Sequence, residues 1–246
     1  MTILDSMVKS GDWLFRWRGY LPFLLLPLFV VSFIGAQDRT LGDDGDLLWG
    51  LGCFVVALFG LAIRIATVGT IASGTSGRNT LTQAARSLNT TGIYSLVRHP
   101  LYLGNYFVAL GISLYPRAWY LPIIVTALFL LYYERIIARE EAFLEEQFGD
   151  EFRIWAARTP ALIPHSLRLY VRSALPFSWR FVLGRESYTL CLIAIIFLIL
   201  DIIQNLFAER KLAFERLWIF IALGSFVLFV VLRSLKKAGL LAVSDR

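Results

Sequence analysis

The side chains best suited to chemistry form two groups that are far apart in the sequence. Arg98-His99-Pro100 precedes an apolar stretch and Glu140-Glu141 follows another, so 41 positions separate His99 from Glu140. Ionisable residues are costly at membrane depth, and those at the ends of apolar stretches are candidates for a functional site. A guanidinium, an imidazole and two carboxylates suit a zwitterionic ligand of the amino-acid type, because arginine binds its anionic end and glutamate its ammonium.

Two short apolar runs must bring these groups together. Leu101–Tyr115 and Trp119–Tyr133 are separated by the turn signal Pro116-Arg117, which predicts a helical hairpin whose open ends lie at one face of a membrane. At 1.5 Å per residue each arm would be about 24 Å long, slightly short of a hydrocarbon core. The run Arg139–Glu146 contains good helix formers, so we expect the second arm to continue through it and to end at Gly149.

The composition is that of a membrane protein. Of 246 residues, 57% are hydrophobic and the mean hydropathy is +0.65, and a soluble domain of this length could not bury so much apolar surface. We predict an all-α, polytopic fold with about six transmembrane helices, the hairpin included, in a single membrane domain. The four longer apolar stretches are Tyr20–Ala36, Leu47–Ile65, Tyr188–Ala208 and Leu217–Leu232.

The charges predict orientation rather than a nucleic-acid partner. The net charge is +6, but the Lys and Arg residues bracket apolar stretches and do not form a solvated patch. Their distribution among the loops predicts that both termini are cytoplasmic, in a multi-pass protein for which a bacterial inner membrane is the expected location. The charged first 18 residues predict no cleavable signal peptide. Cys53 and Cys191 lie in apolar runs, and with two histidines and no paired Cys motif we expect no metal site.

Each candidate residue also has a structural interpretation. Arg64 and Arg98 could be ordinary positive-inside flanks of their helices. His99 could be a plain helix cap before Pro100 at the first helical position. Glu140-Glu141 could be a solvated helix face with partners one turn away.

Polar and small residues inside the apolar runs leave further alternatives. Tyr102 and Tyr106 share one face of the first arm with His99. Gly104 and Gly111, seven positions apart, form a line on which the backbone could approach either a ligand or a neighbouring helix. Asp201 is expected mid-span in the fifth helix, where we favour structural hydrogen bonding over a lipid-substrate path.

The motif around His99 resembles a known signature. The segment Gly92–Gly104, with the sequence GIYSLVRHPLYLG, is similar to that of the isoprenylcysteine carboxyl methyltransferase and phospholipid methyltransferase superfamily. The resemblance covers about Arg64 to Pro164, and Phe152 and Trp155 depart from it at positions that are often tyrosine. The second half of the pattern matches at Glu140, Glu141, Leu144, Phe148, Gly149, Pro160 and Pro164.

This resemblance implies an integral-membrane enzyme that uses S-adenosylmethionine, bound from the cytoplasm, while a lipid acceptor arrives laterally between helices. It implies a methyltransferase core at residues 64–164. Beyond this core the mixture of aromatic and basic residues predicts an interfacial segment at 165–187, and hydropathy predicts two additional helices at 188–246, about which the resemblance implies nothing. The cofactor-binding residues that it implies are His99, Pro100, Tyr102, Leu103, Gly104, Glu140 and Glu141, and the candidate catalytic residues are Arg98, His99, Arg64 and Arg78.

The predicted reaction is in-line attack of an acceptor oxygen or nitrogen on the sulfonium methyl group. The segment Thr75–Thr80 resembles, more weakly, a bacterial branch that methylates phosphate on lipid A. Arg64 and Arg78 would suit an anionic acceptor, so a phosphate or carboxylate is preferred to the amine of phosphatidylethanolamine. The alternatives are phosphatidylethanolamine N-methylation and a non-catalytic membrane protein that retains the fold. The sequence predicts no oligomeric state.

Overall fold

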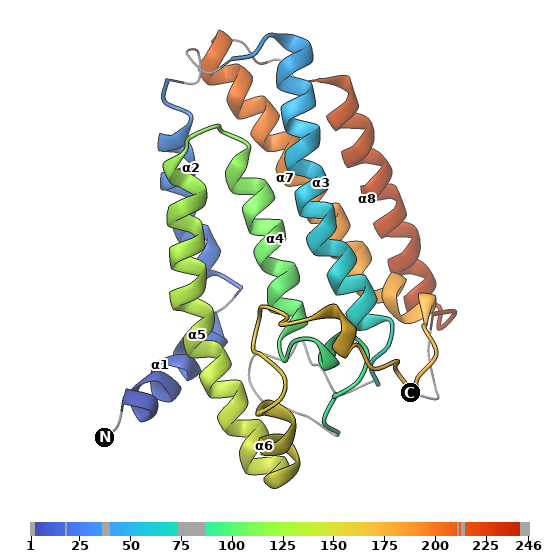
Figure 1. Cartoon of the computed structure of the whole chain (residues 1–246). Helices are drawn as coiled ribbons and strands as arrows, with labels where there is room; N and C mark the ends of the chain where they lie inside the picture. Colours follow the sequence, from blue (N-terminus) through green and yellow to red (C-terminus); the bar gives the residue numbers. More distant parts are fainter. Residues whose placement is uncertain are drawn as a thin grey trace.

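The computed structural model describes residues 3–17, 19–35, 40–72, 87–210, 212 and 215–241, which form a bundle of helices (Figure 1). Three short 3-10 turns, at Leu21–Leu25, Ile93–Ser95 and Leu167–Leu169, connect them. No β-strand occurs in these described ranges, which confirms the predicted all-α fold. The α-helices are α1 (Ile3–Trp17), α2 (Leu26–Ser32), α3 (Asp43–Val68), α4 (Pro100–Leu114), α5 (Tyr120–Phe148), α6 (Asp150–Ala156), α7 (Trp179–Glu209) and α8 (Arg216–Lys237).

Four helices, namely α3, α5, α7 and α8, are long and apolar enough to cross a membrane. Two shorter apolar helices, Phe23–Ser32 and Pro100–Leu114, bring the number of apolar helices in the described part of the chain to the predicted six. The first of them is shorter than the predicted stretch Tyr20–Ala36, in which one proline lies at the start of the 3-10 turn Leu21–Leu25 and a second at the start of the seven residues of α2. The protein is therefore a multi-pass membrane protein.

The hairpin of α4 and α5 has arms of unequal length. The arm α4 has 15 residues, as expected, whereas α5 has 29, because the helix continues beyond the apolar run that ends at Tyr133, as predicted. It continues through the charged run and ends at Phe148, where Gly149 adopts a φ of +53°, so the predicted end is confirmed. A residue with positive φ, Arg117, forms the turn between the arms.

Among the described helices the most extensive contact is between α3 and α4, and glycines make it possible. A Cβ at Gly104 would lie 2.6 Å from Cγ of Arg64 and 2.8 Å from the carbonyl oxygen of Gly60. A Cβ at Gly111 would lie 2.5 Å from the carbonyl oxygen of Cys53. The bare faces of Gly104 and Gly111 thus meet α3, so of the two predicted uses the structure favours helix packing.

One helix boundary and one additional helix differ from the prediction. The helix α7 begins at Trp179, where the hydroxyl of Ser178 accepts a hydrogen bond from the amide of Phe181, so the last part of the predicted interfacial segment is helical. The N-terminal helix α1 was not predicted. It packs on α5 through Gly11, where a Cβ would lie 2.3 Å from the carbonyl oxygen of Arg135.

Asp201 lies near the end of α7 rather than at mid-span. Its Oδ2 accepts a hydrogen bond of 2.8 Å from the amide of Glu215, just before α8, and its Oδ1 accepts one of 3.3 Å from the hydroxyl of Tyr115. The side chain therefore fixes the start of α8 and the end of α4, as the structural alternative predicted. Nearby, aromatic rings of Phe54, Phe197 and other residues pack in the main core.

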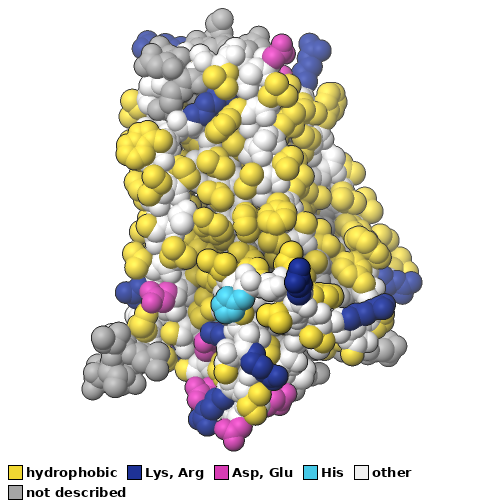
Figure 2. Space-filling view, in the orientation of Figure 1, with side chains coloured by type: hydrophobic (Ala, Val, Ile, Leu, Met, Phe, Trp, Pro, Cys, Tyr) yellow, Lys and Arg dark blue, Asp and Glu magenta, His cyan; other side chains and the backbone are white. Residues whose placement is uncertain are grey.

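The polar groups gather at the two ends of the bundle. In Figure 2 the middle of the visible face is mostly hydrophobic, while charged side chains concentrate towards the lower end. That end contains α1, the start of α4, α6 and the end of α8, whereas the α4–α5 turn lies at the opposite end (Figure 1). The predicted cytoplasmic site would occupy the lower end.

Candidate active site

Backbone hydrogen bonds hold the start of α4 against a distant loop. The amide of Arg98 donates to the carbonyl oxygen of Pro160 at 2.8 Å, and the amide of His99 donates to that of Ala161 at 3.0 Å. Pro100 occupies the first turn of α4, where its missing amide hydrogen costs nothing. The two halves of the recognised sequence pattern therefore meet at this point.

The side chains of Arg98, His99, Tyr102, Glu140 and Glu141, which we call the base cluster, join the ends of α4 and α5. Arg98 donates two hydrogen bonds to Glu141, from Nε to Oε1 at 2.7 Å and from Nη2 to Oε2 at 3.1 Å. Nε2 of His99 lies 2.9 Å from Oε1 of Glu141, and its Nδ1 lies 3.5 Å from Oε2 of Glu140. The hydroxyl of Tyr102 donates to Oε1 of Glu140 at 2.6 Å. The hairpin therefore brings the predicted groups together.

This arrangement favours the protonated form of His99. Its residue is 7% exposed and each ring nitrogen faces a carboxylate oxygen, so both nitrogens can donate only when the ring is protonated. Burial alone would lower the pKa of His99, but hydrogen bonds and charge from Glu140 and Glu141 outweigh it and raise the pKa above 6.5. A plain helix cap would not need two carboxylate partners.

The base cluster fits a zwitterionic cofactor, although its members already contact one another. The exposed fractions of the Arg98, Glu141 and Glu140 side chains are 16%, 22% and 26%, so a ligand can reach them. Arg98 and His99 occupy both oxygens of Glu141, which makes Glu141 an organising group. Glu140 uses two of about four acceptor positions and can still take an ammonium donor. This donor set fits the amino-acid part of S-adenosylmethionine.

Arg64 lies in a second polar group, and it is not a headgroup flank. Its Nε and Nη2 bind Oε2 and Oε1 of Glu186 at 2.8 and 2.9 Å, and its Nη1 binds Oδ1 of Asn105 at 2.6 Å. Nδ2 of Asn105 donates to the hydroxyl of Tyr133 at 3.1 Å. The ring of Tyr133 lies 4.5 Å from that of Tyr102, which connects this group to the base cluster.

Three of these residues were missed by the sequence analysis. Glu186 lies in a stretch rich in aromatic and basic residues that was assigned to the membrane interface. Asn105 is a polar residue inside an apolar run, and its position three residues after Tyr102 was a usable signal. Tyr133 ends an apolar run, and the sequence predicts that the helix continues beyond it but not what the side chain of Tyr133 contacts.

The remaining predicted residues fall into three situations. Arg78 lies outside the described residues, as does the segment Thr75–Thr80. Pro100 is fully buried at the start of α4, whereas Leu103, further along α4, is partly buried. The side chains of Phe152 and Trp155 are buried, and Nε1 of Trp155 donates to the carbonyl oxygen of Tyr94 at 3.3 Å. In the part of the chain that the structure describes, no set of three His, Cys, Asp or Glu residues could hold a metal ion.

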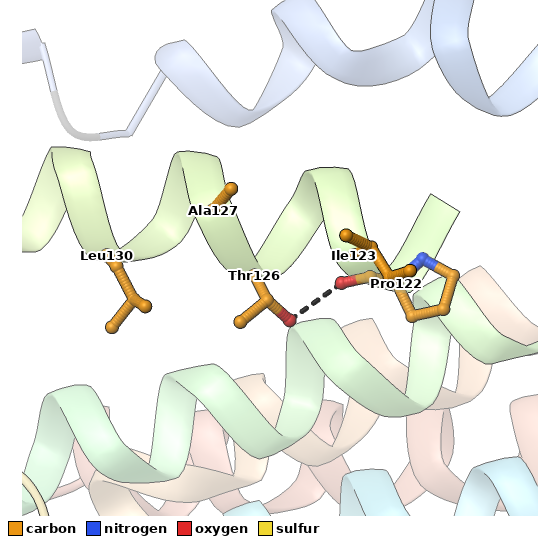
Figure 3. A pocket seen from close by; sticks show the side chains of 5 residues that line it. All are labelled: Pro122, Ile123, Thr126, Ala127 and Leu130. Carbon is orange, nitrogen blue, oxygen red and sulfur yellow. Dashed lines mark hydrogen bonds between the residues drawn. The ribbon is translucent and has the colours of Figure 1, made fainter. Parts of the chain in front are cut away.

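A groove on the side of α5 lies elsewhere. It is lined by Pro122, Ile123, Thr126, Ala127 and Leu130, and the hydroxyl of Thr126 donates to the carbonyl oxygen of Pro122 (Figure 3). None of these side chains is charged. The groove suits apolar contact along a membrane-spanning helix and supplies no group for the chemistry considered above.

Comparison with known proteins identifies a family for the central segment. Residues 48–151, which include the hairpin and Glu140-Glu141, match the family described as phospholipid methyltransferase. A protein-S-isoprenylcysteine O-methyltransferase of Schizosaccharomyces pombe is 32% identical over 77 residues, 31% of this chain and 33% of that protein. No solved structure matches the chain significantly.

Two other relatives carry different names. The cobalt-zinc-cadmium resistance protein CzcN of Cupriavidus metallidurans is 38% identical over 143 residues, which cover 57% of this chain and 62% of the relative. The nickel-cobalt-cadmium resistance protein NccN of Alcaligenes xylosoxydans xylosoxydans is 37% identical over 137 residues, or 55% and 61%. The chain thus spans about three-fifths of the length of these curated relatives.

Proposed function

We propose that this chain, whose residues 48–151 belong to the isoprenylcysteine carboxyl methyltransferase and phospholipid methyltransferase superfamily, transfers a methyl group from S-adenosylmethionine to a membrane-resident acceptor. The observation that carries the proposal is the base cluster. It places a cationic corner and two partly exposed carboxylates at the open end of a membrane hairpin.

In this proposal each residue of the base cluster has a separate task. Glu140 takes the ammonium of the cofactor, because it retains acceptor capacity beside the hydroxyl of Tyr102. Glu141 holds Arg98 and His99, whose positive charges face the carboxylate of the cofactor. The bound cofactor supplies an electrophilic methyl group, and the protein supplies alignment and exclusion of water.

For the acceptor we propose a lipid or lipidated molecule with an anionic oxygen, a phosphate or carboxylate. Such a group is already deprotonated and needs no general base, whereas an amine must lose a proton. Arg64 lies on α3 beside α4 and has the fork geometry that binds such oxygens. Its charge is balanced by Glu186 and its Nη1 binds Asn105, so Arg64 would orient the acceptor through the N–H bonds that remain on Nη1 and Nη2 rather than attract it by an unpaired charge.

The test supplies S-adenosylmethionine with a radiolabelled methyl group to membranes that contain the protein, and identifies the labelled lipids. Label in a methyl ester of a phosphate or carboxylate is the expected result. Label confined to methylated ethanolamine headgroups would refute the proposed anionic acceptor but would still support methyl transfer from S-adenosylmethionine. Absence of label, together with absence of cofactor binding by calorimetry on the detergent-purified protein, would overturn the reaction itself.

The names of the two metal-resistance relatives favour a second candidate, an accessory role in resistance to divalent cations. A growth assay separates this role from catalysis. In a strain lacking the gene and challenged with cobalt, zinc or cadmium, the wild-type protein and a Glu141→Gln variant are compared. Rescue by both would indicate a non-catalytic role, whereas rescue by the wild type alone would connect resistance to the base cluster.

A further inference from the structure

Glu186 is a buried acid in the membrane-proximal start of α7, outside the segment that matches the family. Its side chain is 2% exposed, and its partner Arg64 is 12% exposed. Both oxygens of Glu186 bind the guanidinium, and Oε2 also accepts a hydrogen bond of 2.9 Å from the hydroxyl of Thr189. Burying such a pair costs desolvation energy that the attraction between the two charges barely offsets. The pair therefore adds little net stability, and what it supplies is a fixed geometry.

This geometry extends from α7 to the base cluster. With the Nε–Nη2 edge of the guanidinium bound to Glu186, the Nη1 atom of Arg64 donates to Asn105 on α4. Asn105 in turn accepts from Arg64 through its oxygen and donates through its nitrogen to Tyr133 on α5. The ring of Tyr133 packs on that of Tyr102, the donor to Glu140.

The close contact of α3 with α4 gives the pair its position. Gly104 has no side chain where the aliphatic stem of Arg64 passes, since a Cβ there would lie 2.6 Å from Cγ of Arg64. The stem therefore runs between the two helices, and its guanidinium emerges beside Asn105, one residue after Gly104. Without Glu186 the long side chain could rotate away from this position.

We propose that Glu186 is a positioning residue for methyl transfer. It fixes the guanidinium of Arg64, which we assign to the acceptor, and through Asn105 it fixes Tyr133, whose ring packs on Tyr102 of the base cluster. The inference rests on the proposed function. It assigns a part in the reaction to α7, a helix that lies outside the family-matched segment and that sequence analysis treated as an addition.

The first variant is Glu186→Gln, which keeps the shape of the side chain and removes its charge. We expect turnover to fall by roughly 10- to 100-fold, because a small misplacement of an orienting group has effects of that order. The dissociation constant for S-adenosylmethionine should change little, since Glu140 keeps its bonds to Tyr102 and His99. The matched control is Asp201→Asn, a second buried acid on the same helix at the opposite end, which should keep wild-type turnover.

A double variant keeps the proposal testable if Glu186→Gln does not fold. Changing Arg64→Met together with Glu186→Leu replaces the ion pair by apolar side chains, a change that often preserves stability. We expect this protein to fold and to bind the cofactor but to transfer methyl groups as poorly as Glu186→Gln. Wild-type turnover in either variant would overturn the positioning role. If the wild-type protein itself transferred no methyl group, the proposed function would fail and this inference with it.

Discussion

The substitution Glu141→Gln tests the base cluster most directly. Glu141 receives two bonds from Arg98 and one from His99, so the change removes the negative charge that faces two cations. Glutamine keeps one acceptor oxygen and the same shape. The helix itself should not be perturbed, because both residues are good helix formers.

The magnitude follows from what glutamine can still accept. A hydrogen bond to a charged group contributes about 1.5–3 kcal/mol, and the partial exposure of Glu141 and Arg98 argues against counting all three bonds at full value. We therefore expect the loss of one such bond, which corresponds to cofactor affinity about 10- to 150-fold weaker. The effect reaches the cofactor because Arg98 and His99 would no longer be held in place.

The assay is calorimetric titration of the detergent-purified protein with S-adenosylmethionine, with thermal unfolding followed by tryptophan fluorescence. Glu145→Gln is the matched control, since Glu145 lies one turn further along α5 and pairs with an exposed arginine, Arg153. The control should bind the cofactor like the wild type. Equal dissociation constants for the Glu141 and Glu145 variants would refute the assignment of Glu141 to the site.

Other measurements test the remaining assignments. Because the folded-state pKa of His99 is raised above 6.5, the stabilisation that protonated His99 gives is fully present below pH 6.5 and is lost as the pH rises through the raised pKa. The difference in melting temperature between the wild type and His99→Gln should therefore shrink at alkaline pH. A difference that stays constant with pH would contradict the protonated state. Gly111→Ala should destabilise the protein by about 1–3 kcal/mol, since the new methyl group meets α3, whereas Gly52→Ala, with nothing within 4 Å, should not; equal unfolding curves would refute the packing role. Asp201→Ala should cost about 1–3 kcal/mol of stability and leave cofactor affinity unchanged, and a loss of affinity instead would give Asp201 a functional role.

Much of the base cluster was predictable, because the information is local. Pro116-Arg117 marks a turn between two apolar runs, and a turn there forces the ends of the runs to the same side. The cluster of His99 with Glu140 and Glu141 then follows because both groups lie at the ends of the arms that face away from the turn. What could not be predicted was that Arg98 and His99 occupy Glu141 and leave Glu140 the more available of the two acids.

The role of Arg64 shows where local reasoning stops. Its partner Glu186 is 122 positions away, on a helix whose start was placed too late along the chain. Hydropathy gives the apolar centre of a span well, but its ends depend on capping and on neighbouring helices, and the contacts of α7 are made at such an end. The two uses left open for Gly104, cofactor approach and helix packing, have the same spacing and could not be separated by sequence.

The sequence by itself therefore determined the membrane environment, the hairpin and the two acidic and basic groups at its base, because hydropathy and a turn act along the chain. Only the tertiary structure decided which cation pairs with which acid, that Gly104 and Gly111 face α3, and that α1 lies against α5. These depend on the rotation of each helix about its own axis. Packing against neighbours sets that rotation, and the order of residues along one helix does not encode it alone.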